Sequence, residues 1–280
     1  MGFVGLGQIG AAMAERLVGW PGGLVVFDVR DDTAAPFAAK GAAVATSVRE
    51  VGECARLVSV MVRDDDQVRA VVDELLVSPV PGTVVAIHST IRPGTAEELA
   101  RAAAPAGVHV VDAPVSGGEA GARQGRLAVL VGGDADAVER CREPFGRFAE
   151  VVVRFGPPGA GTRAKLARNL LTFVGFTAAA EAQRVAEAAG LDLGALAKVV
   201  RHSDGVTGGV GAIMVRPTTA PLPTDDPLYD ILCHTRELGE KDLALALELC
   251  AELGVDVPLT ELALEHLASS LGVPRGDRPG

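Results

Sequence analysis

Hydrophobic residues in the first 155 positions fall into short, nearly continuous runs that are rich in valine. Such runs are typical of strands that are buried on both faces of a parallel sheet. Between them lie segments in which apolar residues recur with helical spacing, such as residues 8–19, 65–76 and 95–104. This alternation predicts an α/β fold with a doubly wound sheet. Strands are expected at residues 2–5, 24–27, 57–61, 83–87, 108–111, 128–131 and 150–153.

The pattern becomes helical after residue 159 and stays so almost to the end of the chain. Residues 162–189 form one run without proline, which Gly190 closes in the position where a left-handed residue ends a helix. A helix of this length would span roughly 42 Å. We therefore expect two domains, a doubly wound domain over residues 1–157 and an all-helical domain over residues 158–280. The later helices are expected at residues 193–201, 228–253 and 260–271.

Composition and charge narrow the classes of function. With 48% hydrophobic and 22% charged residues, the chain of 280 residues is globular, and its net charge of −10 disfavours nucleic acid and anionic membranes as partners. The four cysteines are too scattered for a disulfide framework or a structural zinc site, so no metal is expected. A glycine motif already at Gly5 leaves no room for a signal peptide. These features predict a reduced, cytoplasmic protein.

A G-x-G-x-x-G motif follows the first expected strand and precedes the first expected helix. In this context each glycine has a mechanical role: Gly5 makes a tight turn, Gly7 lets a pyrophosphate approach the backbone, and Gly10 lets helix and strand pack closely. The motif therefore predicts a Rossmann domain that binds a dinucleotide, although an ordinary glycine-rich turn would read the same. The expected cofactor-binding residues of the motif are Gly5, Leu6, Gly7, Gln8, Ile9 and Gly10.

Asp28 ends the second expected strand, 18 residues after Gly10. An acidic residue about 20 positions beyond the motif hydrogen-bonds the adenosine ribose hydroxyls of NAD. The 2′-phosphate of NADP would be repelled there, so NAD is expected and NADP is disfavoured, with Arg30 as the opposing feature. Asp28 could instead be a turn residue, because the polar residues that follow it continue a loop.

Several segments together resemble the β-hydroxyacid dehydrogenase family, which includes 3-hydroxyisobutyrate dehydrogenase, tartronate semialdehyde reductase and 6-phosphogluconate dehydrogenase. The most specific is D-A-P-V-S-G-G at residues 112–118. The segments occur in family order over nearly the whole chain. They are residues 2–10, 88–93, 112–118, 159–169 and 240–246.

The resemblance implies a substrate site and a catalytic pair. Ser116, Gly117 and Gly118 would hold the substrate carboxylate, and a Ser-Gly-Gly turn indeed exposes backbone donors without side-chain bulk. Lys165 would be the general acid that protonates the carbonyl oxygen, and Asn169, one helical turn further, would orient it. The alternatives are a plain turn and a solvated surface lysine. Only four of the 26 basic residues are lysines, however, and arginine serves as the ordinary surface cation, which favours a specific role for Lys165.

The same resemblance implies further contacts with the cofactor. Lys241 would close the cleft from the helical domain, although it could simply pair with Glu237 four residues earlier. Arg168 stands where the family usually has asparagine, and His88 where a small or acidic residue is commoner, which puts the substrate in doubt more than the reaction. The remaining expected cofactor contacts are Val62, Arg63, Gln67 and Thr90.

Together these features predict an oxidoreductase that transfers hydride between NAD and a small β-hydroxy acid, such as 3-hydroxyisobutyrate, or its semialdehyde or keto form. The apolar face of the long helix favours a homodimer or tetramer. Two other readings stay open. An imine reductase looks similar in sequence but usually replaces the lysine, and a non-catalytic NAD-binding sensor or scaffold would not need it.

Overall fold

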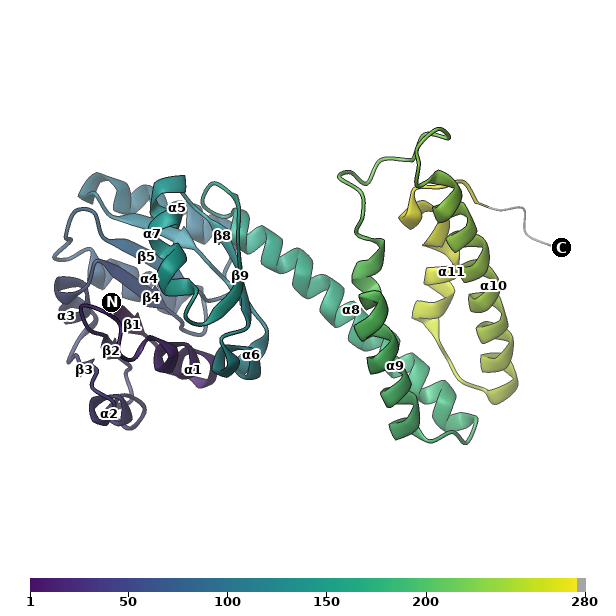
Figure 1. Cartoon of the computed structure of the whole chain (residues 1–280), viewed down its shortest axis with the longest axis horizontal. Helices are drawn as coiled ribbons and strands as arrows, with labels where there is room; N and C mark the ends of the chain where they lie inside the picture. Colours follow the sequence, from purple (N-terminus) through teal and green to yellow (C-terminus); the bar gives the residue numbers. More distant parts are fainter. Residues whose placement is uncertain (276–280) are drawn as a thin grey trace. The chain divides into compact units, whose positions relative to one another are not determined.

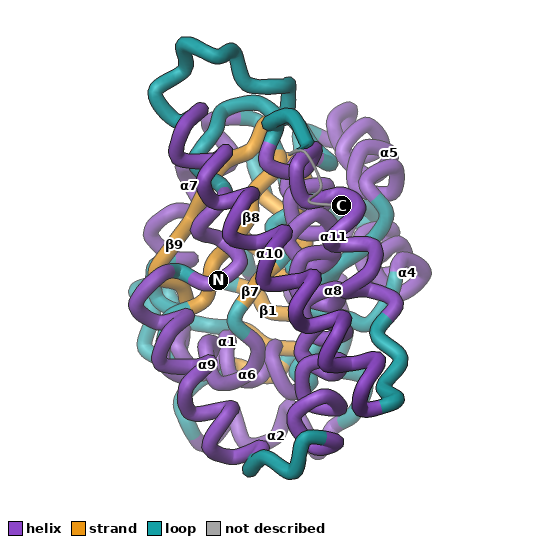
Figure 2. Tube along the Cα trace, turned by 90° about the vertical axis from the view of Figure 1, so that its right-hand side faces the viewer, coloured by secondary structure: helices purple, strands orange, loops and turns teal. Residues whose placement is uncertain are grey.

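A computed structural model describes residues 1–275 and divides the chain into two compact units. The N-terminal unit, Met1–Asn169, contains every strand assigned within those residues, and the unit that starts at Leu170 is helical (Figures 1 and 2). The junction lies inside a long helix. A domain boundary between residues 157 and 158 therefore stays a prediction.

The N-terminal unit is built on a nine-stranded sheet in the order β3-β2-β1-β4-β5-β6-β8-β7, with β9 beside β8. Neighbouring strands from β3 through β6 are parallel, which confirms the doubly wound fold. The strands are β1 (Gly2–Val4), β2 (Val25–Phe27), β3 (Ala43–Val44), β4 (Leu57–Val60), β5 (Val84–Ile87), β6 (His109–Asp112), β7 (Val115–Ser116), β8 (Leu127–Gly132) and β9 (Ala149–Gly156).

The expectation of a wholly parallel sheet is wrong at one side. Strand β8 runs antiparallel to β6 and β7, and β9 pairs parallel with β8, so both strands run opposite to β1 through β6. A parallel crossover needs a dozen or more residues, whereas only the ten residues 117–126 separate β7 from β8. The short connection therefore forces the antiparallel pairing.

Helices cover both faces of this sheet, with one apolar core on each side. Neighbouring residues of β1 point to opposite cores, Phe3 into the cluster under α1 and α7 and Val4 into the cluster under α4 and α5. The parallel strands end at one common edge, where a doubly wound sheet binds its ligands. The helices are α1 (Gln8–Leu17), α2 (Asp31–Ala39), α3 (Val48–Cys54), α4 (Asp65–Leu75), α5 (Pro93–Ala103), α6 (Gly118–Gln124) and α7 (Ala135–Phe145), with a 3₁₀ turn η1 (Ala104–Ala106).

The long helix expected at residues 162–189 is present as α8 (Ala160–Ala188), which starts in the N-terminal unit and continues into the helical one. Gly190 follows it with a φ of +74°, the left-handed conformation that ends helices. The next helix is six residues longer than expected, because it continues to Thr207. Gly208, which follows it, also has a positive φ and ends the helix. The other elements of this unit are α9 (Leu193–Thr207), η2 (Gly209–Ile213), α10 (Tyr229–Leu253) and α11 (Pro258–Leu271).

The helical unit has a small core of its own, in which α10 and α11 pack side by side (Figure 1). Its buried centre is Leu232, Leu271 and Val273. The carboxylate of Glu181 on α8 accepts the backbone N–H groups of Leu259 and Thr260, so it caps the start of α11. Within residues 1–275 there is no helix with the length and apolar character needed to cross a bilayer.

Candidate active site

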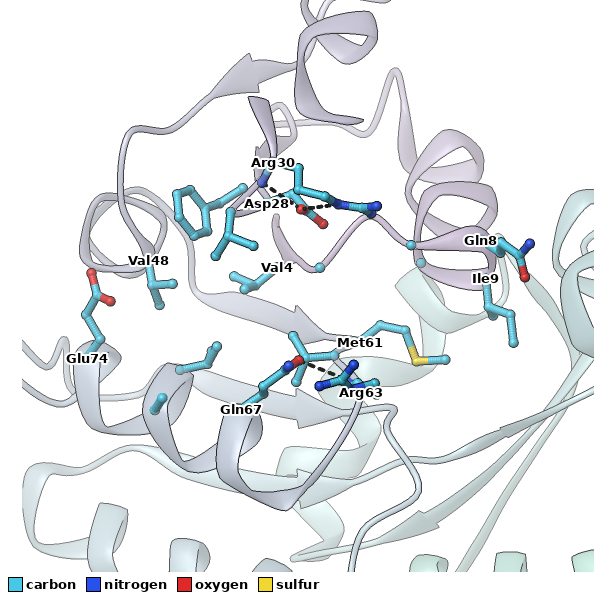
Figure 3. A pocket seen from close by; sticks show the side chains of 18 residues that line it. Val4, Gln8, Ile9, Asp28, Arg30, Val48, Met61, Arg63, Gln67 and Glu74 are labelled. Atoms are coloured by element: carbon cyan, nitrogen blue, oxygen red, sulfur yellow. Dashed lines mark hydrogen bonds and ion pairs between the residues drawn. The ribbon is translucent and has the colours of Figure 1, made fainter. Parts of the chain in front are cut away.

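A cleft of about 850 Å³ opens at the edge of the sheet where β1, β2 and β4 end (Figure 3). It brings together most of the cofactor-binding residues expected from the sequence. It also contains residues that were not assigned from the sequence, some from strand ends and loops beside the motif and others from helices α3 and α4, which no motif marks. The expected lining residues are Gly5, Gly7, Gln8, Ile9, Gly10, Asp28, Val62, Arg63 and Gln67, and the unassigned ones are Val4, Phe27, Val29, Arg30, Val48, Met61, Ala70, Val71 and Glu74.

The geometry of the glycine loop explains each of its glycines. Gly5 has a φ of +92°, and a Cβ there would overlap the carbonyl oxygen of Met61. A Cβ at Gly10 would overlap the carbonyl oxygen of Gly5, so α1 packs directly on the loop. At Gly7, by contrast, a Cβ would have no other described atom within 4 Å. The glycines therefore keep the backbone close to β4 and leave open space beside Gly7.

Asp28 organises the other side of this loop. Its Oδ2 accepts the backbone N–H of Leu6 at 2.7 Å, and its Oδ1 accepts the N–H of Arg30 at 2.9 Å and lies 3.4 Å from Arg30 Nε. Burial alone would raise the pKa of Asp28, but these hydrogen bonds outweigh it and hold the pKa below its usual value. Leu6 therefore contributes its N–H to Asp28, while its side chain lies in the core.

The loop after β4 is fixed by two side chains. Ser89 Oγ accepts the N–H of Val62 at 3.0 Å and donates to the carbonyl oxygen of the same residue at 2.7 Å. Gln67 Oε1 accepts the N–H of Arg63 at 3.1 Å, an interaction drawn in Figure 3. These hydrogen bonds fix the backbone of the loop at the edge of the cleft. Thr90 lies just beyond Ser89 and is exposed, and it is not among the residues that line the cleft.

The Ser-Gly-Gly segment forms the turn between β7 and α6. Ser116 ends β7 and is half-buried, and the two glycines after it are exposed. Gly117 has a φ of +129° and Gly118 a φ of +63°, conformations that residues with a side chain rarely adopt. The glycines are therefore required for the turn that presents their backbone to solvent.

Lys165 lies on the second turn of α8 and is 91% buried, as its exposed fraction is 9%. Burial, together with the positive charge of Arg168 on the same helix, lowers the pKa of Lys165. Among the described residues its ammonium group has no hydrogen-bond or ion-pair partner. Asn169 lies one turn further on the same face and is half-buried. A lysine of lowered pKa exchanges protons more readily near neutral pH.

Lys241 is on α10 in the helical unit, where its side chain is exposed. Its Nζ lies 2.9 Å from Asp242 Oδ1, and Glu237 pairs with Arg236 instead. The alternative reading, a pairing of Lys241 with Glu237, is therefore not formed. Its contact with the cofactor stays a prediction.

His88 does not belong to the reactive groups. It is fully buried among Phe3, Phe145 and Phe148, and burial lowers its pKa to about 4. Asp112, at the end of β6, is the polar residue that the sequence analysis passed over. Its carboxylate is also fully buried, and it accepts two N–H groups at the start of α8.

The residues of the cleft fit a dinucleotide. Open space beside Gly7 faces the N-terminus of α1, whose backbone N–H groups and dipole favour a pyrophosphate. The ionised carboxylate of Asp28 provides acceptors for ribose hydroxyls. Over residues 1–275, no group of three His, Cys, Asp or Glu side chains is arranged to hold a metal ion.

The comparisons with known proteins agree with this geometry. Residues 1–156 match the family model of the NAD-binding domain of 6-phosphogluconate dehydrogenase. The chain is 58% identical over 280 residues to an uncharacterised oxidoreductase of Mycobacterium tuberculosis, which covers 99% of this chain and 95% of that protein. It is 35% identical to the NAD-dependent L-serine dehydrogenase of Pseudomonas aeruginosa, over 94% of this chain and 89% of that protein.

Solved structures give the same result. The 3-hydroxyisobutyrate dehydrogenase of Mycobacterium tuberculosis, solved with L-serine, has a TM-score of 0.68 at 33% identity, over 95% of this chain and 91% of that chain. An imine reductase of Streptomyces aurantiacus has a TM-score of 0.76 at 19% identity, over 97% and 95%, which is a likeness of fold alone. The chain therefore belongs to the NAD-binding oxidoreductase family of 3-hydroxyisobutyrate dehydrogenase and 6-phosphogluconate dehydrogenase.

Proposed function

We propose that the protein is an NAD-dependent dehydrogenase that oxidises the hydroxyl group of a small β-hydroxy acid, or reduces the corresponding carbonyl compound. The observation that carries this proposal is the state of Lys165. It is a buried lysine of lowered pKa, four residues before Asn169 on a helix whose start is anchored to the end of β6. A solvated surface lysine would have neither property.

The chemistry assigned to the chain is a proton transfer at Lys165 Nζ. During oxidation the neutral amine accepts the proton of the substrate hydroxyl, and during reduction the ammonium donates a proton to the carbonyl oxygen. The nicotinamide ring, when bound, accepts or supplies the hydride. Asn169 orients the lysine or the substrate oxygen from the adjacent turn.

The substrate class follows from the Ser116 turn and from the relatives. Backbone N–H groups of Gly117 and Gly118, with the hydroxyl of Ser116, suit a single carboxylate. The relatives are named for L-serine and 3-hydroxyisobutyrate, and both molecules carry a hydroxymethyl group on the carbon next to a carboxylate. We expect the substrate of this protein to share that arrangement.

For the cofactor, NAD is preferred to NADP because the ionised Asp28 would repel a 2′-phosphate. Along the cleft, the α1 end receives the pyrophosphate, Asp28 the ribose, and the apolar end with Val48 and Val71 the adenine. Thr90 and Lys241 complete the nicotinamide end. The active form is a homodimer or tetramer.

The proposal is tested by following absorbance at 340 nm with NAD or NADP and a panel of hydroxy acids, including L-serine and 3-hydroxyisobutyrate. A second panel contains cyclic imines, which an imine reductase would reduce with NADPH or NADH. We expect turnover with at least one β-hydroxy acid and none with the imines. Turnover of imines alone would replace the proposal by the imine reductase reading, and NADH binding without any turnover would favour a sensor or scaffold.

A further inference from the structure

The buried carboxylate of Asp112 connects two parts of the proposed active site. Asp112 is the last residue of β6, four residues before Ser116, and is fully buried. Its Oδ1 accepts the backbone N–H of Gly159 at 2.7 Å, and its Oδ2 accepts the N–H of Thr162 at 2.6 Å. Helix α8 begins at Ala160. Both oxygens of one side chain therefore satisfy N–H groups that the first turn of a helix leaves without an internal partner.

The backbone around this contact is packed as closely as glycine allows. A Cβ at Gly161 would overlap the carbonyl oxygen of Leu130, and it would lie 2.6 Å from the carbonyl oxygen of Asp112. A Cβ at Gly132, the β8 residue that pairs with Asp112, would overlap the Asp112 carboxylate itself. The first turn of α8 is thus held against β6 and β8 without room to shift.

Lys165 is three residues after Thr162 on the same helix face, or about 4.5 Å further along the axis. Because a helix is rigid over one turn, whatever fixes Thr162 also fixes the start of the lysine side chain. Thr162 is fully buried and Lys165 nearly so, which places both on the face turned toward the N-terminal unit. The position and burial of Lys165 therefore depend on the anchor at Asp112.

We propose that Asp112 is a positioning residue for catalysis, which holds the first turn of α8 so that Lys165 stays buried at a fixed distance from the Ser116 turn. This inference rests on the proposed function of Lys165, and it adds the residue that places it. The ionised form suits the role, since a carboxylate has only acceptors and both oxygens face N–H donors. An amide would turn an N–H₂ group toward one of these donors.

The test compares Asp112→Asn with a matched control from the same chain. Glu181 is also a buried carboxylate that accepts two backbone N–H groups at a helix start, but it caps α11. Glu181→Gln therefore makes the same chemical change away from Lys165. The measurements are kcat, the Kd for NADH from fluorescence and the urea midpoint of unfolding. In addition, peptide mapping gives the acetylation midpoint of each lysine, which is the pH at which its acetylation rate reaches half of its maximum. With four lysines in the chain, Lys165 is resolved from Lys40, Lys198 and Lys241.

We expect Asp112→Asn to raise the acetylation midpoint of Lys165 toward that of the exposed Lys198, and to lower kcat about 10–100-fold, with the Kd for NADH changed less than twofold. Glu181→Gln should lower the urea midpoint without moving the Lys165 midpoint. The proposal is overturned when Asp112→Asn loses stability as the control does and leaves the Lys165 midpoint unchanged. A raised midpoint with unchanged kcat supports the positioning role and counts against Lys165 as the proton donor.

A second variant covers the case in which Asp112→Asn does not fold. Asp112→Ser removes the charge, keeps one oxygen acceptor at this position and adds no bulk to the buried site. It should raise the Lys165 midpoint in the same direction. An unchanged midpoint in a folded Asp112→Ser protein would also overturn the proposal.

Discussion

The hydroxyl of Ser59 on β4 lies 3.1 Å from Nε2 of His88, just after the neighbouring strand β5. On its other side the ring places Nδ1 at 2.8 Å from the carbonyl oxygen of Ala113, which can only accept, so Nδ1 carries the proton and Nε2 accepts from Ser59. The neutral ring thus links three successive segments of the sheet edge. Protonation would force Nε2 to become a donor inside an apolar core.

This arrangement predicts an acid-sensitive contribution to stability. The pKa of His88 falls from 6.5 to about 4 on folding, so below pH 6.5 the unfolded chain binds a proton that the folded chain does not. Stability should be unaffected by His88 above about pH 6.5 and should fall by about 3 kcal/mol as the pH drops to 4. Urea unfolding of wild type and His88→Gln between pH 7.5 and 4.5 measures this change in the free energy of unfolding. The variant should be less stable at pH 7, and its free energy of unfolding should depend less on pH.

Replacement of the proposed proton donor should affect turnover and spare cofactor binding. Lys165→Ala is expected to lower kcat by about 10²–10⁴-fold, the usual size of a general acid–base contribution. The Kd for NADH should change little, because Lys165 is not among the residues that line the dinucleotide cleft. Lys198→Ala, on the exposed surface of α9, is the control. Near-normal turnover of Lys165→Ala would remove the lysine from the mechanism.

The charge of Arg168 should be visible in the pH profile. Burial first, and then the positive charge of Arg168, lower the pKa of Lys165. Arg168→Gln removes the second cause, so the pKa should rise while burial still holds it below its usual value. Because oxidation needs the neutral amine, the rise of kcat with pH should move to higher pH. Arg163→Gln, on the same helix as Lys165, breaks an ion pair with Glu97 of α5 and should leave the profile in place.

The parts of the site that were predicted from sequence are those determined by neighbours in the chain. The roles of Gly5, Gly7 and Gly10 follow from a turn between one strand and one helix, and the spacing to Asp28 follows from a single βα unit. The end of α8 was equally local, since Gly190 alone marks it. In each case the residues that set the conformation lie within one or two elements of each other.

The parts that were missed depend on contacts between distant segments. Asp112 accepts from Gly159 and Thr162 about 50 positions away, and nothing in its own segment distinguishes a helix cap from a turn residue. The two-residue strand β7 was missed because it is defined only by its pairing with β8, and with it the short connection that makes β8 antiparallel. One signal was available for Asp112. Helix α8 has no Ser, Thr, Asp or Asn at residue 159, so its first N–H groups required an acceptor from elsewhere.

The apolar side chains on the α8 segment of the helical unit predict assembly. Leu170, Phe173 and Phe176 are 67%, 61% and 64% exposed within one chain, and the core of that unit is small. Exposed apolar surface of this kind usually lies in an interface. Light scattering at micromolar concentration should report at least twice the chain mass of 28.7 kDa, and Phe173→Glu with Phe176→Glu should shift the particle toward one chain. A wild-type particle of 28.7 kDa would contradict this expectation.

The choice of cofactor depends on the contact between Asp28 and Arg30. Arg30 is the cation that could pair with the 2′-phosphate of NADP, but both its backbone N–H and its Nε are directed to Asp28 Oδ1 (Figure 3). The Arg30 side chain is more than half exposed, and the Asp28 carboxylate is its ion-pair partner within residues 1–275. We therefore expect Asp28 to act twice against NADP, by repelling the phosphate and by retaining the arginine that would neutralise it.

We expect wild type to prefer NAD by at least tenfold in kcat/KM, which corresponds to about 1.4 kcal/mol. Asp28→Ser should remove both effects, because the hydroxyl cannot hold Arg30 and carries no charge, so the preference should move toward NADP. Arg30→Ala alone should keep or sharpen the preference for NAD, and Asp28→Ser with Arg30→Ala should lose the gain with NADP. Steady-state kinetics with both cofactors on the four proteins measures each step. Equal or better efficiency of wild type with NADP would mean that Arg30 dominates the site in spite of the carboxylate beside it.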